Sequence, residues 1–85
     1  MFLEIITPEE RVFEGEVDSA IFPGSKGSFQ VLNDHAPLVS SLGNGDVKII
    51  KTVEKKTEEV HFELNGGVIE VFNNRILVLA EEVAS

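Results

Sequence analysis

The chain has 85 residues, which is the length of a single domain. It contains no cysteine and only two histidines, so disulfides and thiol chemistry are excluded and a structural zinc site is disfavoured. Fifteen acidic against seven basic residues give a net charge of −8, which disfavours nucleic acid and anionic lipid as partners. No apolar run approaches the ~18 residues of a membrane span, so we expect any membrane association to come through another protein.

Short strands separated by turn residues are predicted in the first half of the chain. The segment FLEIIT (2–7) is rich in isoleucine and ends before Pro8, which lacks a backbone donor. The segments RVFEG (11–15), EVDSAIF (16–22) and SFQVL (28–32) follow, with Gly15 dividing the first two. Within 16–22 the side chains alternate between two faces, as they do along a strand.

The second half of the chain has clearer strand signals. DVKIIKTV (46–53) leads to the polar turn EKKT (54–57), and EEVHFEL (58–64) alternates, with its apolar residues inward and His61 outward. VIEVF (68–72) and RILVLA (75–80) flank Asn73-Asn74, a pair suited to a tight hairpin turn. RILVLA is apolar on both faces and is predicted to be a central strand, and only AEEVAS (80–85) has a helical composition. The predicted core comprises Val60, Phe62, Leu64, Ile69, Val71, Ile76, Val78 and Ala80, with Phe22 and Phe29 at least partly buried.

These signals together predict one all-β domain over residues 1–85. Short strands between Gly, Pro and Asn turns are typical of an antiparallel β-sandwich or flattened barrel, here of about eight to ten short strands in two packed sheets. We expect less helix than the ~30 % typical of globular domains.

The segment PGSKGSFQVLNDHAPLVSSLGNG (23–45) is rich in glycine and could suggest a phosphate loop. A phosphate loop needs four residues between its glycines and a helix after them, and GSKG has neither. Its glycines are therefore interpreted as turn residues that permit positive φ. These are Gly24, Gly27, Gly43 and Gly45.

The same segment could suggest an acid–base–nucleophile set, with Asp34-His35 and Ser40-Ser41 as its members. Such a set is recognised by geometry, and neighbours along a strand or turn point apart. The Gly-x-Ser-x-Gly elbow of many serine hydrolases is missing. The carboxylate pairs 58–59 and 81–82 are interpreted as solvated surface. No catalytic residue and no metal ligand are predicted.

Lys26 supports one alternative function. Small acidic β-sandwiches include lipoyl and biotinyl carriers, in which a lysine at a hairpin tip carries the cofactor. The flanking residues of Lys26 are Ser25 and Gly27, whereas carriers have Asp or Met beside the lysine. The similarity is therefore one of size and charge, and a free-standing carrier or ligand-binding module is the second hypothesis.

A resemblance to a known family covers essentially the whole chain. Pro23-Gly24 with Gly27, then His35-Ala36-Pro37-Leu38, and Leu42 with Gly45 follow its pattern in order. NGGVIEVFNNRILVLAEE (65–82) is similar to a second block of that pattern, and FLEIITPEERVFEGEV (2–17) fits its first two strands. The chain resembles the N-terminal β-sandwich domain of the epsilon subunit of rotary F-type ATP synthases, which is called delta in mitochondria.

The resemblance implies a non-catalytic, structural role in the central stalk, with no cofactor. The domain would grip the gamma subunit and rest on the polar loops of the membrane c-ring, coupling ring rotation to the catalytic head. The residues expected to contact gamma are Thr7, His35, Ser40 and Asn65. The residues expected to contact the c-ring are Lys26, Gly27, Ser28, Phe29 and Gln30.

The resemblance also sets expectations about place and regulation. The chain is expected to be peripheral on the cytoplasmic face of a bacterial inner membrane, held there only through the complex. Members of the family commonly continue into a C-terminal helical hairpin that inhibits ATP hydrolysis, and this sequence ends at Ser85. Coupling without inhibition or ATP binding is therefore expected, whether the sequence is a naturally short member or one domain of a longer chain.

Overall fold

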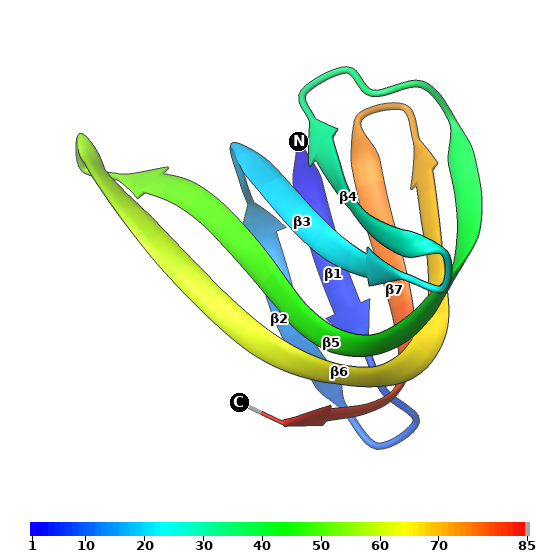
Figure 1. Cartoon of the computed structure of the whole chain (residues 1–85). Coiled ribbons are helices and arrows are strands. Elements are labelled where there is room, and N and C mark those ends of the chain that lie inside the picture. The colour runs from blue at the N-terminus through cyan, green and yellow to red at the C-terminus, as the bar shows by residue number, and fades with distance from the viewer. Residues whose placement is uncertain (85) are drawn as a thin grey trace.

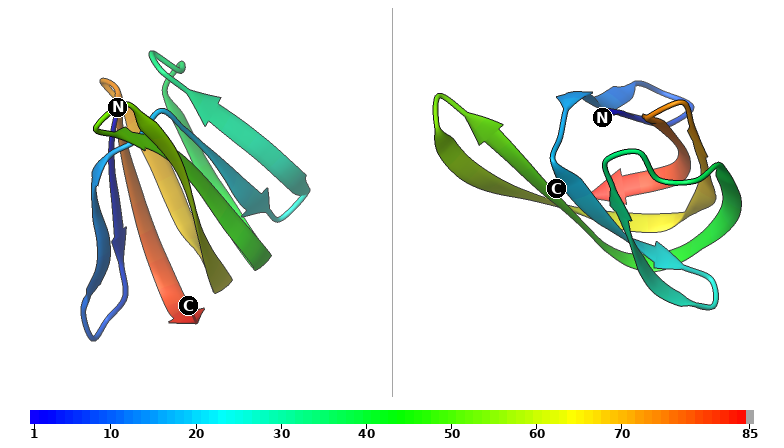
Figure 2. Two further views of the ribbon diagram at one scale, coloured as in Figure 1. Left: turned by 90° about the vertical axis from the view of Figure 1, so that its left-hand side faces the viewer. Right: turned by 90° about the horizontal axis from the view of Figure 1, so that it is seen from above.

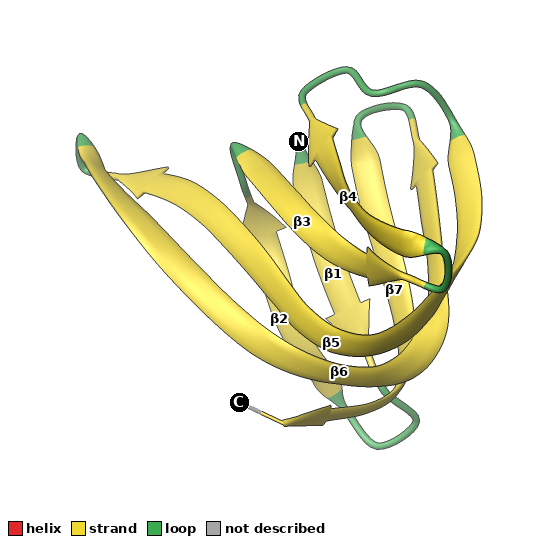
Figure 3. Ribbon diagram, in the orientation of Figure 1, coloured by secondary structure: helices red, strands yellow, loops and turns green. Residues whose placement is uncertain are grey.

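The computed structural model describes residues 1–84, which form seven strands and no helix. The strands are β1 (Phe2–Ile6), β2 (Arg11–Glu16), β3 (Ser19–Gly24), β4 (Gly27–Leu32), β5 (Leu38–Val53), β6 (Lys56–Phe72) and β7 (Arg75–Ala84). They form one sheet in the order β2-β1-β7-β6-β5-β3-β4, as Figures 1 and 3 show. All neighbours pair antiparallel except β1 and β7, which are parallel. The all-β class is confirmed.

The prediction of about eight to ten short strands was wrong, because two strands are long. β5 has 16 residues and joins the expected loop before Gly45 to the strand after it. β6 has 17 residues and joins two segments that were expected to be separate strands. Both strands bend, so the two halves of each strand lie in different layers (Figure 2). The two expected sheets are therefore two halves of one sheet that folds over on itself.

Glycines allow this bend in both strands. Gly66 and Gly67 of β6 have φ values of 70° and 144°, which disfavour other residues. A Cβ atom on Gly67 would lie 2.5 Å from the carbonyl oxygen of Leu79, so β6 and β7 approach closely only because Gly67 has no side chain. On β5, Gly43 and Gly45 lie near this segment, since Leu42 pairs with Gly67 and Gly45 with Leu64. Of the four glycines expected at positive φ, only Gly27 has one, at 125°.

The core lies between the two layers of the folded sheet. Inward positions of β5 change from even to odd numbers across the bend, so Leu42 before it and Val47 after it are both buried. Phe22 is fully buried and packs against half-buried Phe29, with ring centroids 6.0 Å apart. Of the predicted core, only Val60 and Phe62 are less buried than expected. The buried core comprises Leu3, Ile5, Val17, Ala20, Phe22, Val31, Leu42, Val47, Ile49, Leu64, Ile69, Val71, Ile76, Val78 and Ala80.

The turns match the sequence in part. Asn73 and Asn74 have φ values of 50° and 59°, which confirms the predicted tight hairpin between β6 and β7. The break between the second and third strands falls at Val17-Asp18, whereas it was expected at Gly15. Residues 81–84 continue β7 where a helical composition was noted, and Ser85 lies outside the described residues.

Candidate docking face

The catalytic readings of the sequence are not supported by side-chain geometry. His35 places Nδ1 2.8 Å from the carbonyl oxygen of Ala36, and Ser40 donates to the carbonyl of Ser41 at 3.2 Å. Within residues 1–84, no hydrogen bond joins His35 to Asp34 or to either serine, and no group of His, Asp and Glu is arranged to hold a metal ion. In the same residues, no helix is long and apolar enough to cross a membrane.

A row of exposed apolar side chains covers the outer side of one layer, made by β1, β7, the second half of β6 and the start of β5. Val39 is 71 % exposed, Phe72 55 %, Leu79 51 % and Val68 45 %. Large apolar side chains exposed together on one face are typical of a docking surface. We call this surface the outer apolar face; it comprises Phe2, Ile6, Val39, Val68, Phe72, Leu77 and Leu79.

Strand pairing explains why these side chains are contiguous. Leu79 of β7 lies opposite Ile6 of β1 on one side and opposite Val68 of β6 on the other. Directly opposed residues of neighbouring strands point to the same face of a sheet. The hairpin strands β6 and β7 and the sequence-distant strand β1 therefore contribute to one apolar row.

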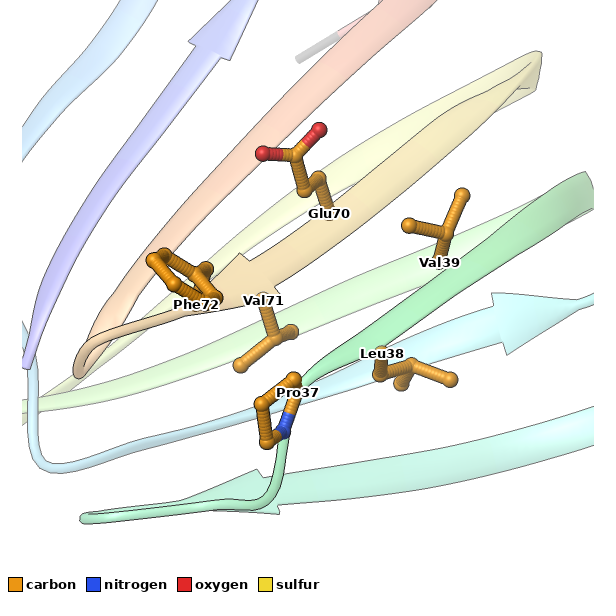
Figure 4. Close-up of a pocket in the computed structure, with 6 residues that line it drawn as sticks. All are labelled: Pro37, Leu38, Val39, Glu70, Val71 and Phe72. Carbon is orange, nitrogen blue, oxygen red and sulfur yellow. The ribbon is translucent and has the colours of Figure 1, made fainter.

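Shallow hollows mark the outer apolar face. One of about 310 Å³ lies between the start of β5 and the end of β6, and Figure 4 shows Val39 and Glu70 on the same side of these strands. A second hollow, of about 290 Å³, lies between the end of β1 and β7, and Leu79 lines it. A third, of about 200 Å³, lies beside Arg75. These hollows give the face enough depth to receive side chains of a partner.

Charges of both signs lie on this face: Glu70, Arg75, and Glu4, which lies opposite Leu77 and pairs with Arg11 at 3.3 Å. Arg75 places its guanidinium 5.0 Å from the centre of the Phe2 ring, a cation–π contact. Glu70 lies opposite Leu77 on one strand and Val39 on the other. Within residues 1–84, neither Glu70 nor Arg75 forms an ion pair, so both are available to a partner.

The residues expected to contact gamma do not all lie on this face. Thr7 lines its second hollow, beside the β1–β2 turn. Asn65 is exposed on β6 near the bend, where its Nδ2 donates to Glu82 at 3.1 Å. Ser40 pairs with buried Ile69, so it faces the interior side of the sheet and is half-buried there.

His35 lies in the β4–β5 loop, which is tied to the β6–β7 turn. The amide of Asp34 donates to Oδ1 of Asn74 at 2.8 Å, and Nδ2 of Asn74 donates to Oδ1 of Asn33 at 2.9 Å. These bonds join positions about 40 residues apart and hold the loop next to Phe72, at one end of the outer apolar face. No sequence signal indicated this clamp.

The residues expected to contact the c-ring lie on the β3–β4 hairpin but point in different directions. Ser25 and Lys26 form the turn, and Gly27 begins β4. Ser28 and Gln30 are exposed, whereas Phe29 packs inward on Phe22. A groove of about 360 Å³ lies where this turn meets the start of β5, and Ser40 lines it together with Lys26.

The exposed side of the β5–β6 hairpin carries a small charged network. His61 places Nδ1 2.6 Å from Asp46 and Nε2 2.6 Å from Glu59, and Lys48 lies 3.4 Å from Glu59. The hydrogen bond with Glu59, and after it the one with Asp46, raises the pKa of His61 above its usual 6.5. The bond with His61 is also the main cause that lowers the pKa of Glu59. Both ring nitrogens face carboxylates, so the protonated imidazolium satisfies both contacts.

The fold and these surfaces define a small all-β docking module: a folded sheet with an apolar outer face and no buried polar or charged residue among those described. The family described as "ATP synthase, Delta/Epsilon chain, beta-sandwich domain" matches residues 1–85. The chain belongs to this family, as the resemblance in the sequence indicated.

Relatives and solved structures agree with this assignment. The chain is 42 % identical over 82 residues to an ATP synthase epsilon chain of Chlorobaculum tepidum and covers 90 % of it. It is 38 % identical to that of Salinibacter ruber but covers only 58 % of that longer chain. One chain in a central stalk and c-ring structure of the Tetrahymena thermophila mitochondrial ATP synthase has the same fold, with a TM-score of 0.83 at 21 % identity, over all of this chain and 66 % of that one. The family therefore assigns the chain to the rotor stalk of an ATP synthase, an enzyme complex associated with a membrane.

Proposed function

We propose that this chain couples the c-ring to the gamma subunit as a non-catalytic rotor subunit, and that the outer apolar face is where gamma docks. The observation that carries the proposal is the contiguous row of Ile6, Leu79 and Val68, exposed across three strands. Such a row is costly to leave in water, and a stalk subunit has a permanent partner that can cover it.

Covering this face with a partner is energetically favourable. Leu79 is 51 % exposed, so covering it removes about half a leucine side chain from water, worth roughly 1 kcal/mol. Phe72 and Val39 are exposed to a similar or greater extent and add comparable amounts. Glu70 and Arg75, which are free of ion pairs among residues 1–84, would set the orientation of the partner more than its affinity.

The four gamma contacts implied by the resemblance fit this face unequally. Thr7 borders one of its hollows, and the loop of His35 is clamped at its opposite end. Asn65 lies near the bend, beside the same layer. Ser40 faces the groove behind β5, so we assign it to the surface that contains Lys26.

The remaining parts of the proposal concern place and chemistry. The β3–β4 hairpin, with Lys26, Ser28 and Gln30 exposed, is proposed to rest on the polar loops of the c-ring. The chain would then be peripheral on the cytoplasmic face of a bacterial inner membrane, bound only through the complex. Catalysis would remain with other subunits of the synthase, and family membership leaves the carrier hypothesis for Lys26 without support.

A binding experiment tests the docking face. Leu79→Glu puts a charge at the centre of the proposed contact, and burying an unpaired charge should weaken gamma binding by at least about tenfold. Val53→Glu is the matched control, because Val53 is also exposed, at 42 %, but lies at the end of the β5–β6 hairpin. Binding to purified gamma is measured by biolayer interferometry, with circular dichroism to verify folding. Equal losses for both variants, or none for Leu79→Glu, would place gamma elsewhere.

A further inference from the structure

The groove between the β3–β4 turn and β5 differs in charge from the rest of the molecule. The chain carries a net charge of −8, yet residues 19–33 and 35–45 contain no acidic residue. Lys26 is the only lysine or arginine in these two segments. Within residues 1–84 it forms no ion pair, whereas Arg11, Lys48 and Lys51 do. The turn is thus an isolated positive site on a negative protein.

Hydroxyl groups line the groove beside this charge. Its walls are the β3–β4 turn, with Ser25 and Lys26, and the start of β5, with Ser40 and Ser41. The Oγ atoms of Ser25 and Ser41 lie 2.7 Å apart, so one hydroxyl donates to the other. The accepting hydroxyl keeps its own proton and can donate it to a ligand.

One acceptor beside the groove, the carbonyl oxygen of Ser41, is already occupied. The carbonyl oxygen of Ser41 receives the amide of Ser25 at 3.2 Å and the hydroxyl of Ser40 at 3.2 Å. What the groove offers is therefore an ammonium group with three donors and at least one hydroxyl proton. A carboxylate accepts such bonds through two oxygens and carries the complementary charge. A basic side chain would meet repulsion from Lys26 instead.

We propose that this groove receives a carboxylate side chain from the rotor component that docks against the β3–β4 turn. The inference rests on the proposed function and adds the chemistry of the contact: the partner presents Asp or Glu to Lys26 and the serine hydroxyls. An anionic membrane surface is the less suitable source of a negative group, because the net charge of −8 repels an extended negative surface. Lys26 can attract a single carboxylate on a protein loop at short range, within the Debye length of about 8–10 Å over which salt does not fully screen the attraction.

Charge variants of Lys26 test the proposal in the full chain. Binding to a gamma–c-ring complex stripped of this subunit is measured at about 50 and about 200 mM salt. Lys26→Gln should weaken binding about tenfold, Lys26→Glu should weaken it further, and Lys26→Arg should keep it within about twofold. The loss should shrink at the higher salt concentration. Lys56→Glu is the matched control, since Lys56 is exposed at the start of β6, away from the groove.

The outcomes separate this inference from the proposed function. If the wild-type chain does not bind the stripped rotor at all, the proposed function fails. If it binds but Lys26→Glu binds as tightly or more tightly, the carboxylate is wrong while the rotor role stands. Wild-type binding to phosphatidylglycerol vesicles that Lys26→Glu abolishes would replace the protein carboxylate by a lipid headgroup. Rescue of Lys26→Glu by an acidic-to-lysine change in the partner loop would identify the carboxylate itself.

Discussion

Substitution of Gly67 tests whether the close approach of β6 and β7 sets the bend of the sheet. An alanine Cβ there would lie 2.5 Å from the carbonyl oxygen of Leu79 and 3.0 Å from Cα of Ala80, both backbone atoms that cannot rotate away. The φ value of 144° adds strain for any L-residue, typically about 1–3 kcal/mol. The clash would also force β6 and β7 apart. We therefore expect Gly67→Ala to lower the free energy of unfolding by at least about 3 kcal/mol, a large part of the roughly 4–13 kcal/mol typical of a domain of this length.

Gly27 supplies the matched control for this prediction. Its φ of 125° is similarly restrictive, but a Cβ there would meet nothing within 4 Å. Gly27→Ala therefore carries the backbone strain without the clash, and should cost only about 1–3 kcal/mol. Urea unfolding followed by far-UV circular dichroism gives the midpoint and the m-value for each variant. Equal midpoint shifts for the two variants, or a wild-type midpoint for Gly67→Ala, would refute the argument that close strand approach requires this glycine.

Three further outcomes are expected from other parts of the molecule. Phe22→Ala empties a fully buried site and should lower the free energy of unfolding by about 3–5 kcal/mol in urea titrations, and a loss below about 1 kcal/mol would contradict this. Asn74→Gly keeps a residue that tolerates the φ of 59° but removes the side-chain oxygen that accepts the amide of Asp34. Hydrogen exchange of that amide should become faster, while the midpoint of urea unfolding stays unchanged. The pKa of His61 is raised in the folded protein, so the stability that the protonated His61 contributes is fully present below pH 6.5. This stability is lost as the pH rises through the pKa of the folded state. His61→Gln should remove this loss of stability at high pH. The pKa of Glu59 is lowered, so the stability that Glu59 contributes should be lost only as the pH falls below 4.5.

The all-β class and the β6–β7 turn could be predicted from the sequence because they depend on local chemistry. Alternation marked Leu64, Ile69 and Val71 as buried, and they are. Asn73-Asn74 predicted the β6–β7 turn because asparagine tolerates positive φ, and both residues have it. The family could also be recognised, since its blocks are contiguous segments with fixed spacing.

The continuity of the sheet could not be predicted, because it depends on contacts between distant segments. The glycines near residues 43–45 and 65–67 indicated breaks between strands, but these glycines lie in neighbouring parts of β5 and β6 and let both strands bend without ending. Local propensity therefore overcounted the strands. Phe29 combines two expectations: the resemblance implied a c-ring contact for it, and the sequence predicted a partly buried ring, which the structure confirms by its packing on Phe22.

The candidate surfaces divide in the same way between sequence and tertiary structure. The sequence by itself determined that RILVLA is apolar on both sides, but not that one side remains exposed at Leu79. That exposure depends on the sheet having two layers, so that β7 is covered on one face only. Only the folded sheet brings Ser40 of β5 beside Lys26 of the β3–β4 turn. Alternation along a strand determines which residues share a face, and only the packing of the layers decides which face is left for a partner.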